Sequence, residues 1–196
     1  TNTKLVNLYK DGLQREQFLP FISIIQNYSI QLELSLKNDY RLKNLNEKQR
    51  IFFPLNESTL FMINKNFREL TRDKKKSAKK ITTKGRDFII DNFYDGILRF
   101  KFKDLCDKNL GAEDYINISK ISDHIFIEEI PFFNDALSNQ QLRFITLIDI
   151  LYEKKITLSL SLENDLNNLG SSRKHSQIFK RTTSRLIELT QKRLIS

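Results

Sequence analysis

The feature that most constrains the fold of this chain is the spacing of apolar residues along its second half. The spacing changes between every second residue, as in a strand, and about every 3.6 residues, as in a helix. Near the C-terminus, apolar residues take every second position, as in a β-strand with one face toward a core: Ile156, Leu158, Leu160 and Leu162. The preceding stretch, 134–154, has its apolar residues at helical spacing, and 124–130 is a short apolar run ended by Pro131. Strands that alternate with helices favour an α/β fold with a largely parallel sheet.

The clearest turn signal in the sequence is the pair Asp95-Gly96. It separates two apolar runs, 88–94 and 97–102. A D-G pair suits a tight two-residue turn between antiparallel strands, because such turns need positive φ at their central residues. The sequence therefore predicts an antiparallel hairpin inserted into the otherwise parallel sheet.

The remaining segments predict further helices and one more strand. We expect a helix over 8–27 that Pro20 divides into two, because proline removes a helical donor. The other expected helices are 58–70, 105–121 and 177–194, and the expected strand is the alternating run 30–36. The basic run Arg72–Lys80 has no apolar face and is expected to be an exposed connection.

Composition places the chain among folded α/β domains rather than disordered or membrane-spanning segments. The 196 residues are 39% hydrophobic and 11% aromatic, which is enough for one domain or one and a half with a real core. No stretch approaches the roughly 20 apolar residues of a membrane span. The chain starts at Thr1 rather than Met, so we expect the natural N-terminus to be missing or processed.

Cysteine and histidine usage argues against a disulfide and against a metal site. Cys106 is the only cysteine, so no internal disulfide can form, and a reducing compartment is the simplest setting. His124 and His175 have no cysteine or carboxylate at ligand spacing, and we expect neither to bind metal. Cys106, Phe100 and Phe102 are expected in the core.

The formal net charge of +9 has two explanations. It can attract phosphate, nucleic acid or an anionic surface. It can also reflect lysine used as a default surface residue in a chain that is rich in Lys, Asn and Ile, and we favour this second explanation.

The run Leu8–Arg15, followed by Phe18-Leu19-Pro20, resembles the LY-x-x-GLQR-x-x-FLP signature of the ZapE-like AAA+ ATPases. Thr1-Asn2 occupies the last two positions of the family's preceding TSN, and Leu5 stands where the family has proline. A later family motif, RRFI-x-LID, is matched by 143–149, with Leu142 at the position of its first arginine. The remaining matches follow in family order: 39–41 with DYR, 100–106 with F-x-F-x-x-LC, 111–115 with GA-x-DY, 151–153 with LYD and 179–189 with F-x-RT-x-SRL-x-EM.

The resemblance implies the C-terminal part of a P-loop AAA+ ATPase core. Residues 1–45 would end that core, and 46–196 would form a family-specific α/β region with the hairpin and the terminal helix. It also implies ATP and Mg²⁺ as cofactors of the full-length protein. The sequence has no G-x-x-x-x-G-K-[ST] loop and no apolar strand ending in Asp-Glu, and the family places both upstream of this start. We therefore expect residues 1–196 alone to bind no nucleotide and to be inactive.

The resemblance further implies a homo-oligomer that remodels a protein partner, in bacterial cell division or mitochondrial protein quality control. Nucleic acid is not an expected partner, whereas peripheral membrane association is compatible with the resemblance. The expected location is the cytoplasm, at the inner membrane face, or the mitochondrial matrix in a eukaryote. The rival hypothesis is a non-catalytic basic module that contacts nucleic acid or an anionic membrane through Arg72–Lys80.

By resemblance, Asn2 is the sensor-1 residue that orients the attacking water, and Arg15 is the arginine finger that acts on a neighbouring subunit. The alternative for Arg15 is a surface pair with Asp11 at i,i+4.

Three further arginines are candidates for a sensor-2 contact to the nucleotide: Arg143, Arg181 and Arg185. The alternative for them is an ion pair, for example Arg185 with Glu188. Asp149 lies among apolar residues, so we expect it to pair with an arginine or to form a cap rather than to act in catalysis.

Overall fold

The computed structural model describes residues 15–28 and 50–191. The chain divides between Tyr40 and Arg41 into two compact units, and each is described by itself. The expected strand at 30–36 and the sensor-1 residue Asn2 lie outside the described residues. Whether the boundary at 45 separates two functional regions stays a prediction.

In the first unit the described element is α1, Arg15–Tyr28, which contains Pro20. The expectation that Pro20 divides this segment into two helices is wrong for the described part. Pro20 has no backbone N–H, so the helix lacks one hydrogen bond, the one to the carbonyl of Glu16. The helix continues on both sides of Pro20.

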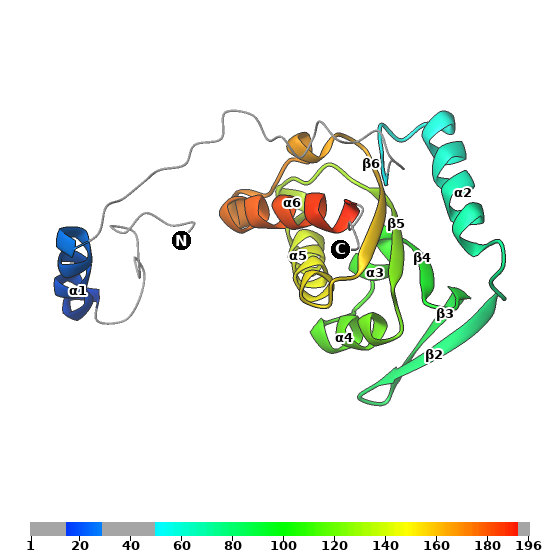
Figure 1. The fold of residues 1–196 in the computed structure, drawn as a ribbon, viewed down its shortest axis with the longest axis horizontal. Helices are drawn as coiled ribbons and strands as arrows, with labels where there is room; N and C mark the ends of the chain where they lie inside the picture. Colours follow the sequence, from blue (N-terminus) through cyan, green and yellow to red (C-terminus); the bar gives the residue numbers. More distant parts are fainter. Residues whose placement is uncertain (1–14, 29–49, 192–196) are drawn as a thin grey trace. The chain divides into compact units, whose positions relative to one another are not determined.

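The second unit is an α/β fold with one six-stranded sheet in the order β1-β6-β5-β4-β3-β2 (Figure 1). The neighbouring strands β1, β6, β5 and β4 are parallel to one another. The pairs β4–β3 and β3–β2 are antiparallel. The α/β class with a mostly parallel sheet and a hairpin is therefore confirmed. The elements are β1 (Ile51–Phe52), α2 (Glu57–Thr71), β2 (Ser77–Thr83), β3 (Arg86–Tyr94), β4 (Ile97–Lys101), α3 (Phe102–Cys106), α4 (Ala112–Lys120), β5 (His124–Ile130), α5 (Ser138–Glu153), β6 (Thr157–Leu162) and α6 (Ser176–Thr190).

The hairpin predicted from Asp95-Gly96 is confirmed as β3 and β4. Asp95 and Gly96 have φ of 43° and 83°, and a Cβ at Gly96 would collide with the carboxylate of Asp123. A second tight turn at Lys84-Gly85, with φ of 49° and 77°, joins β2 to β3. The prediction that Arg72–Lys80 is only a connection is wrong, because β2 begins at Ser77. Charged side chains suit this position, since β2 is an edge strand.

The helices predicted from periodicity are present with altered ends. The segment 105–121 is two helices, α3 and α4, separated at Gly111, whose N–H donates to Asp114 Oδ2 at the start of α4. The prediction of one continuous helix there is wrong. Residues 134–154 begin with the 3₁₀ turn Asp135–Leu137, and α5 ends where Lys155 takes a φ of 57°. The terminal helix occupies Ser176–Thr190.

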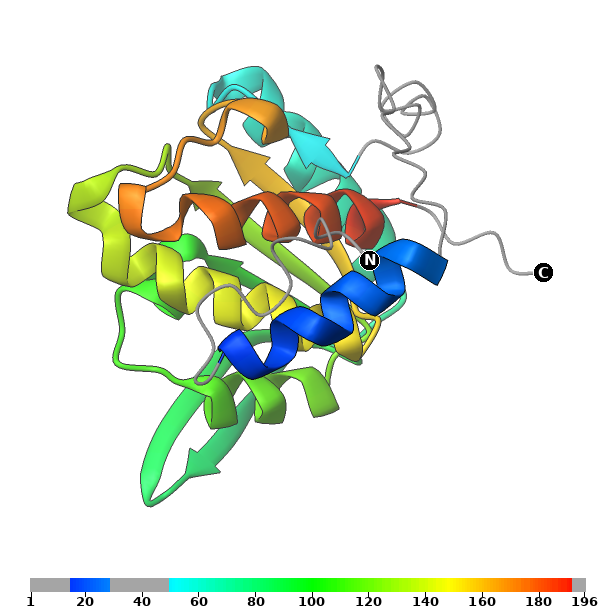
Figure 2. The ribbon, with the colours of Figure 1, turned by 90° about the vertical axis from the view of Figure 1, so that its left-hand side faces the viewer.

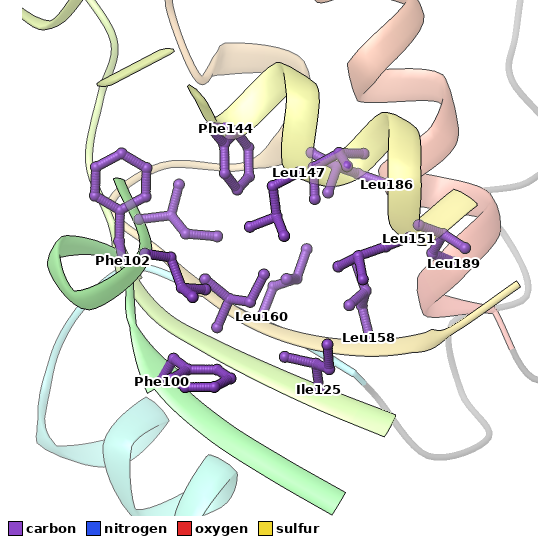
Figure 3. Packing of buried hydrophobic residues seen from close by; sticks show 14 of the residues in the cluster. Phe100, Phe102, Ile125, Phe144, Leu147, Leu151, Leu158, Leu160, Leu186 and Leu189 are labelled. Atoms are coloured by element: carbon purple, nitrogen blue, oxygen red, sulfur yellow. The ribbon is translucent and has the colours of Figure 1, made fainter. Parts of the chain in front are cut away.

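Helices cover both faces of the sheet. In Figure 2, α4, α5 and α6 lie side by side across one face, and α2 lies behind the sheet. The leucines of β6 that alternate in the sequence point to the α5–α6 side, where Leu158 and Leu160 meet Leu147, Leu151 and Leu186 (Figure 3). The other face is covered by α2 through a smaller cluster of Phe52, Ile63, Phe67, Ile97 and Phe126. Phe100, Phe102 and Cys106 are buried as predicted.

Candidate functional site

Two of the predicted site arginines meet on one carboxylate between α5 and α6. Arg181 Nη2 donates to Asp149 Oδ2 at 2.9 Å, and Arg185 Nη1 donates to Asp149 Oδ1. Arg181 and Arg185 are four residues apart on α6, so they project from the same side of that helix. The expectation that Asp149 pairs with an arginine is confirmed.

Arg185 is held more firmly than Arg181. Its guanidinium lies over the ring of Tyr152 with 4.7 Å between Cζ and the ring centroid. Tyr152 in turn donates through its hydroxyl to Glu188 Oε2 at 2.7 Å. The Arg185 side chain is 20% exposed, whereas that of Arg181 is 57% exposed. Arg185 is therefore fixed by packing, and Arg181 is presented to solvent.

The cluster is chemically suited to an anion. A guanidinium has five N–H donors, and each arginine gives Asp149 only part of that set. A phosphate oxygen could bind the remaining donors of Arg181 or replace Asp149, because arginine recognises carboxylate and phosphate with the same planar fork. The ion pair with Glu188 that was considered for Arg185 is replaced by the pair with Asp149.

Arg143 does not join this cluster. It stands six residues before Asp149 on α5, which is a rotation of about 240° about the helix axis. Its Nη1 donates to the backbone carbonyl of Cys106 at 2.9 Å, so Arg143 binds the end of α3 to α5. Burial raises the pKa of the Cys106 thiol, which keeps it protonated in the core.

The other two predicted site residues belong to the first unit. Asn2 lies outside the described residues. Arg15 is the first described residue of α1, in the first unit, and Asp11, its alternative partner, lies outside the described residues.

Sequence reasoning missed a charge network at the ends of β4 and β5, in which the Arg99–Glu128 pair is largely buried. Arg99 donates through both Nε and Nη2 to the carboxylate of Glu128, with Nη2 to Oε2 at 2.8 Å, and Nη2 also donates to Asn64 Oδ1 at 2.6 Å. Lys101 pairs with the neighbouring Glu129, and this hydrogen bond raises the pKa of Lys101.

The network has a sequence signal: in the apolar strand β5, Glu128-Glu129 precede the last residue, Ile130, and β4 carries Arg99 and Lys101 two residues apart. Parallel pairing of β4 with β5 places Arg99 beside Phe126 and Lys101 beside Glu128. The network ties α2 to the sheet through Asn64.

Within residues 15–28 and 50–191, no group of three or more His, Cys, Asp and Glu side chains could hold a metal ion. Over the same described ranges, no helix combines the length and apolar character needed to cross a bilayer.

Comparison with known proteins adds a family match along the whole chain. The family model described as AFG1-like ATPase matches residues 1–196. Lactation elevated protein 1 homolog B of Danio rerio is 28% identical over 165 residues, covering 83% of this chain and 33% of the relative. Cell division protein ZapE of Escherichia coli K12 is 27% identical over 182 residues, covering 93% of this chain and 48% of the relative.

An uncharacterized protein of Schizosaccharomyces pombe is 28% identical over 159 residues, covering 80% of this chain and 35% of the relative. The chain thus spans between a third and a half of the length of these relatives. No solved structure matches the chain significantly.

Proposed function

Because the chain belongs to the AFG1-like ATPase family, we propose that it is the C-terminal part of an ATP-hydrolysing AAA+ protein that remodels a protein partner. The observation that carries this proposal is the family match over residues 1–196, together with signature motifs that occur in family order along the chain. The name of the Escherichia coli relative favours a partner from the cell division machinery.

ATP and Mg²⁺ need a phosphate-binding loop, and the sequence has no G-x-x-x-x-G-K-[ST] motif. The residues of this chain fit a supporting role toward the nucleotide, since the α5–α6 cluster offers guanidinium donors to an anion. In the proposed protein, Asn2 orients the attacking water, and Arg15 reaches the site of the next subunit in a homo-oligomer. The proposed setting is the cytoplasm near the inner membrane, or the mitochondrial matrix for a eukaryotic protein.

Among the three sensor-2 candidates, the contacts favour Arg181. Its side chain is more than half exposed, so a nucleotide can reach it without disrupting the core. Arg185, stacked on Tyr152, positions Asp149. Arg143 is committed to the carbonyl of Cys106, which favours a role in packing.

The test uses a full-length protein that carries this chain. Arg181→Ala should leave the melting temperature unchanged and lower ATP affinity or turnover. Lys180→Ala is the matched control, because Lys180 is an exposed cation on the same helix with no carboxylate within 4 Å among the described residues. Wild-type ATP affinity and turnover in Arg181→Ala would remove this residue from the nucleotide site.

The rival function, a basic module for nucleic acid or anionic membrane, rests on the exposed cations of Arg72–Lys80. Two of them already have acidic partners, since Lys74 pairs with Asp95 at 3.2 Å and Lys80 pairs with Asp87 at 2.7 Å. This pairing reduces the charge available to a polyanion, and we favour the ATPase. Binding of residues 1–196 to an oligonucleotide or to anionic vesicles, with no nucleotide hydrolysis by the full-length protein, would reverse that preference.

A further inference from the structure

The outer face of α2 carries a row of side chains at helical spacing. Phe61, Lys65, Arg68 and Arg72 follow one another at intervals of four, three and four residues, so they lie in one stripe along the helix. The buried side of α2, with Ile63 and Phe67, faces the sheet, which leaves this stripe turned away from it. At about 1.5 Å of rise per residue the stripe is about 16 Å long. We call it the α2 stripe.

The three cations of the α2 stripe are exposed and have no carboxylate within 4 Å among the described residues. Arg68 Nε donates to the carbonyl of Asn64 at 3.3 Å, which leaves its two terminal amino groups for a ligand. By contrast, Arg99, on the other side of α2, donates through Nε and Nη2 to Glu128 and Asn64. The α2 stripe therefore holds positive charge that the fold itself does not neutralise.

The α2 stripe lines a hollow in the surface, and an apolar side chain, Phe61, stands at one end of the stripe. Its four residues, with Glu69, line an open hollow of about 370 Å³. Phe61 is 62% exposed at one end of that hollow, and its neighbours Leu60 and Met62 are 52% and 43% exposed. Exposed apolar surface is unfavourable in water, and a group of exposed apolar side chains beside arginine is typical of a recognition surface.

We propose that the α2 stripe docks an extended acidic segment of a protein partner, with one apolar side chain of that segment against Phe61. Successive cations of the stripe are about 4.5–6 Å apart along the helix axis. Alternate residues of an extended chain are about 6.6 Å apart, so carboxylates at every second position reach successive cations. The proposal rests on the proposed function only in taking the ligand to be a protein partner.

The chemistry of the stripe favours this occupant over three others. A second copy of this chain is a poor match, because the sequence has a net charge of +9 and no three acidic residues at alternate positions. A bilayer would need a continuous apolar face, whereas Phe61 stands in line with three cations and beside Glu69. The phosphates of a nucleic acid would meet the charge of Glu69, and Phe61 would offer the bases one stacking position at the end of the stripe.

The test is fluorescence anisotropy of residues 1–196 with a labelled peptide in which one Phe is followed by three Glu residues at alternate positions, with Ser between them. The variant is the triple charge reversal Lys65→Glu, Arg68→Glu and Arg72→Glu. We expect its Kd to rise about tenfold or more, because three attractive contacts become repulsive. Binding of the unchanged protein should weaken as salt rises, since exposed charges are screened.

The matched control reverses three exposed lysines elsewhere: Lys154→Glu, Lys174→Glu and Lys180→Glu. It has the same net charge as the triple variant, so an equal loss of binding in both would overturn the proposal in favour of a general charge effect. Phe61→Ser should weaken binding of the peptide without changing the salt dependence, and Glu69→Gln should strengthen binding.

Two further probes decide the class of ligand. A single-stranded oligonucleotide and vesicles with anionic lipid should bind residues 1–196 more weakly than the peptide does. Tighter binding of either probe that is lost in the triple variant would contradict the proposal. Because none of these probes is ATP and no hydrolysis is measured, these results stand apart from the test of Arg181.

Discussion

The two faces of the sheet are built from the same strands but are packed in different ways. The face toward α3–α6 is mainly apolar, with rings of Phe102, Phe133 and Phe144 within 5.7 Å of one another between centroids. The face toward α2 mixes a small apolar cluster with polar contacts, among them the Arg99–Glu128 pair and the bond between His124 Nε2 and Ser159 Oγ at 2.9 Å.

This difference indicates that one face contributes most of the stability and the other fixes the position of α2. Burial of large apolar side chains is non-directional and contributes most of the stability, so the α5–α6 face should dominate the free energy of unfolding. Paired charges contribute less net free energy but fix the position of the groups that they join. The α2 face therefore sets where α2 lies, and with it the α2 stripe.

The largest expected effect is on the apolar face. Phe144→Ala should lower the free energy of unfolding by about 3–5 kcal/mol, because Phe144 is fully buried and its removal leaves a cavity between Phe102 and Phe133. Phe67→Ala, in the smaller cluster under α2, is the comparison and should cost less, since Phe67 is 8% exposed. Urea unfolding of both variants measures this, and a larger cost for Phe67→Ala would reverse the proposed ranking of the faces.

The next effect concerns the charge pair on the α2 face. Glu128→Ala should destabilise by about 3 kcal/mol, because it leaves the Arg99 guanidinium without its main partner in a largely buried place. The double variant Arg99→Met with Glu128→Leu should regain most of that loss, since an apolar pair has no charge to desolvate. A double variant that is as unstable as the single one would show that the pair itself stabilises this face.

The third effect is a dependence on pH that arises on the same face. Burial, with a smaller contribution from Arg50, lowers the pKa of His124 to about 3. In the unfolded chain a histidine has a pKa near 6.5. As pH falls below that value, His124 therefore binds a proton in the unfolded state but stays neutral in the folded state. Stability should therefore be constant above about pH 7 and should fall by up to about 1.4 kcal/mol per pH unit below about 6.5.

His124→Gln separates this contribution from that of the carboxylates, because glutamine can replace the bond to Ser159 and does not titrate. Between about pH 6.5 and 4 the variant should lose less stability than the unchanged protein does. Parallel curves for the two proteins would mean that His124 already binds its proton in the folded state.

The sequence was informative where one short pattern determined the local structure. The alternation at 156–162, the apolar run 124–130 and the pair Asp95-Gly96 gave strands and a turn at the right places, because period and positive φ are local properties. The division of 105–121 and the start of β2 at Ser77 depend on contacts between distant segments, such as the bond from Arg86 to Asp114, which no local pattern contains.

The candidate site was predictable in part for the same reason. The spacing of Arg181 and Arg185 placed them on one side of a helix, but their common partner Asp149 lies more than thirty residues away. The separation of Arg143 follows from the packing of α3 against α5, and the Arg99–Glu128 pair follows from the pairing of β4 with β5. These are tertiary facts that the sequence alone does not contain.

The smallest expected effect lies outside both faces, at Asp149. Its side chain is 28% exposed and its partner Arg181 is 57% exposed, so Asp149→Asn should change the free energy of unfolding by less than about 1 kcal/mol. Asp91→Asn is the control, because Asp91 is an exposed carboxylate with no cation within 4 Å among the described residues. Thermal unfolding of both variants should give nearly the same melting temperature.

The value of Asp149→Asn is that stability and nucleotide binding should respond differently. Asparagine keeps the size of the side chain but gives up the charge that competes for Arg181 and Arg185. If these arginines contact phosphate, the full-length protein with Asp149→Asn should bind ATP more tightly than the unchanged protein, while Arg181→Ala binds it more weakly. If the cluster is only a surface ion pair, neither variant should alter ATP affinity, because nothing that touches the nucleotide has changed. Titration of ATP against the two variants and Asp91→Asn therefore separates a nucleotide contact from a pair that only joins α5 to α6.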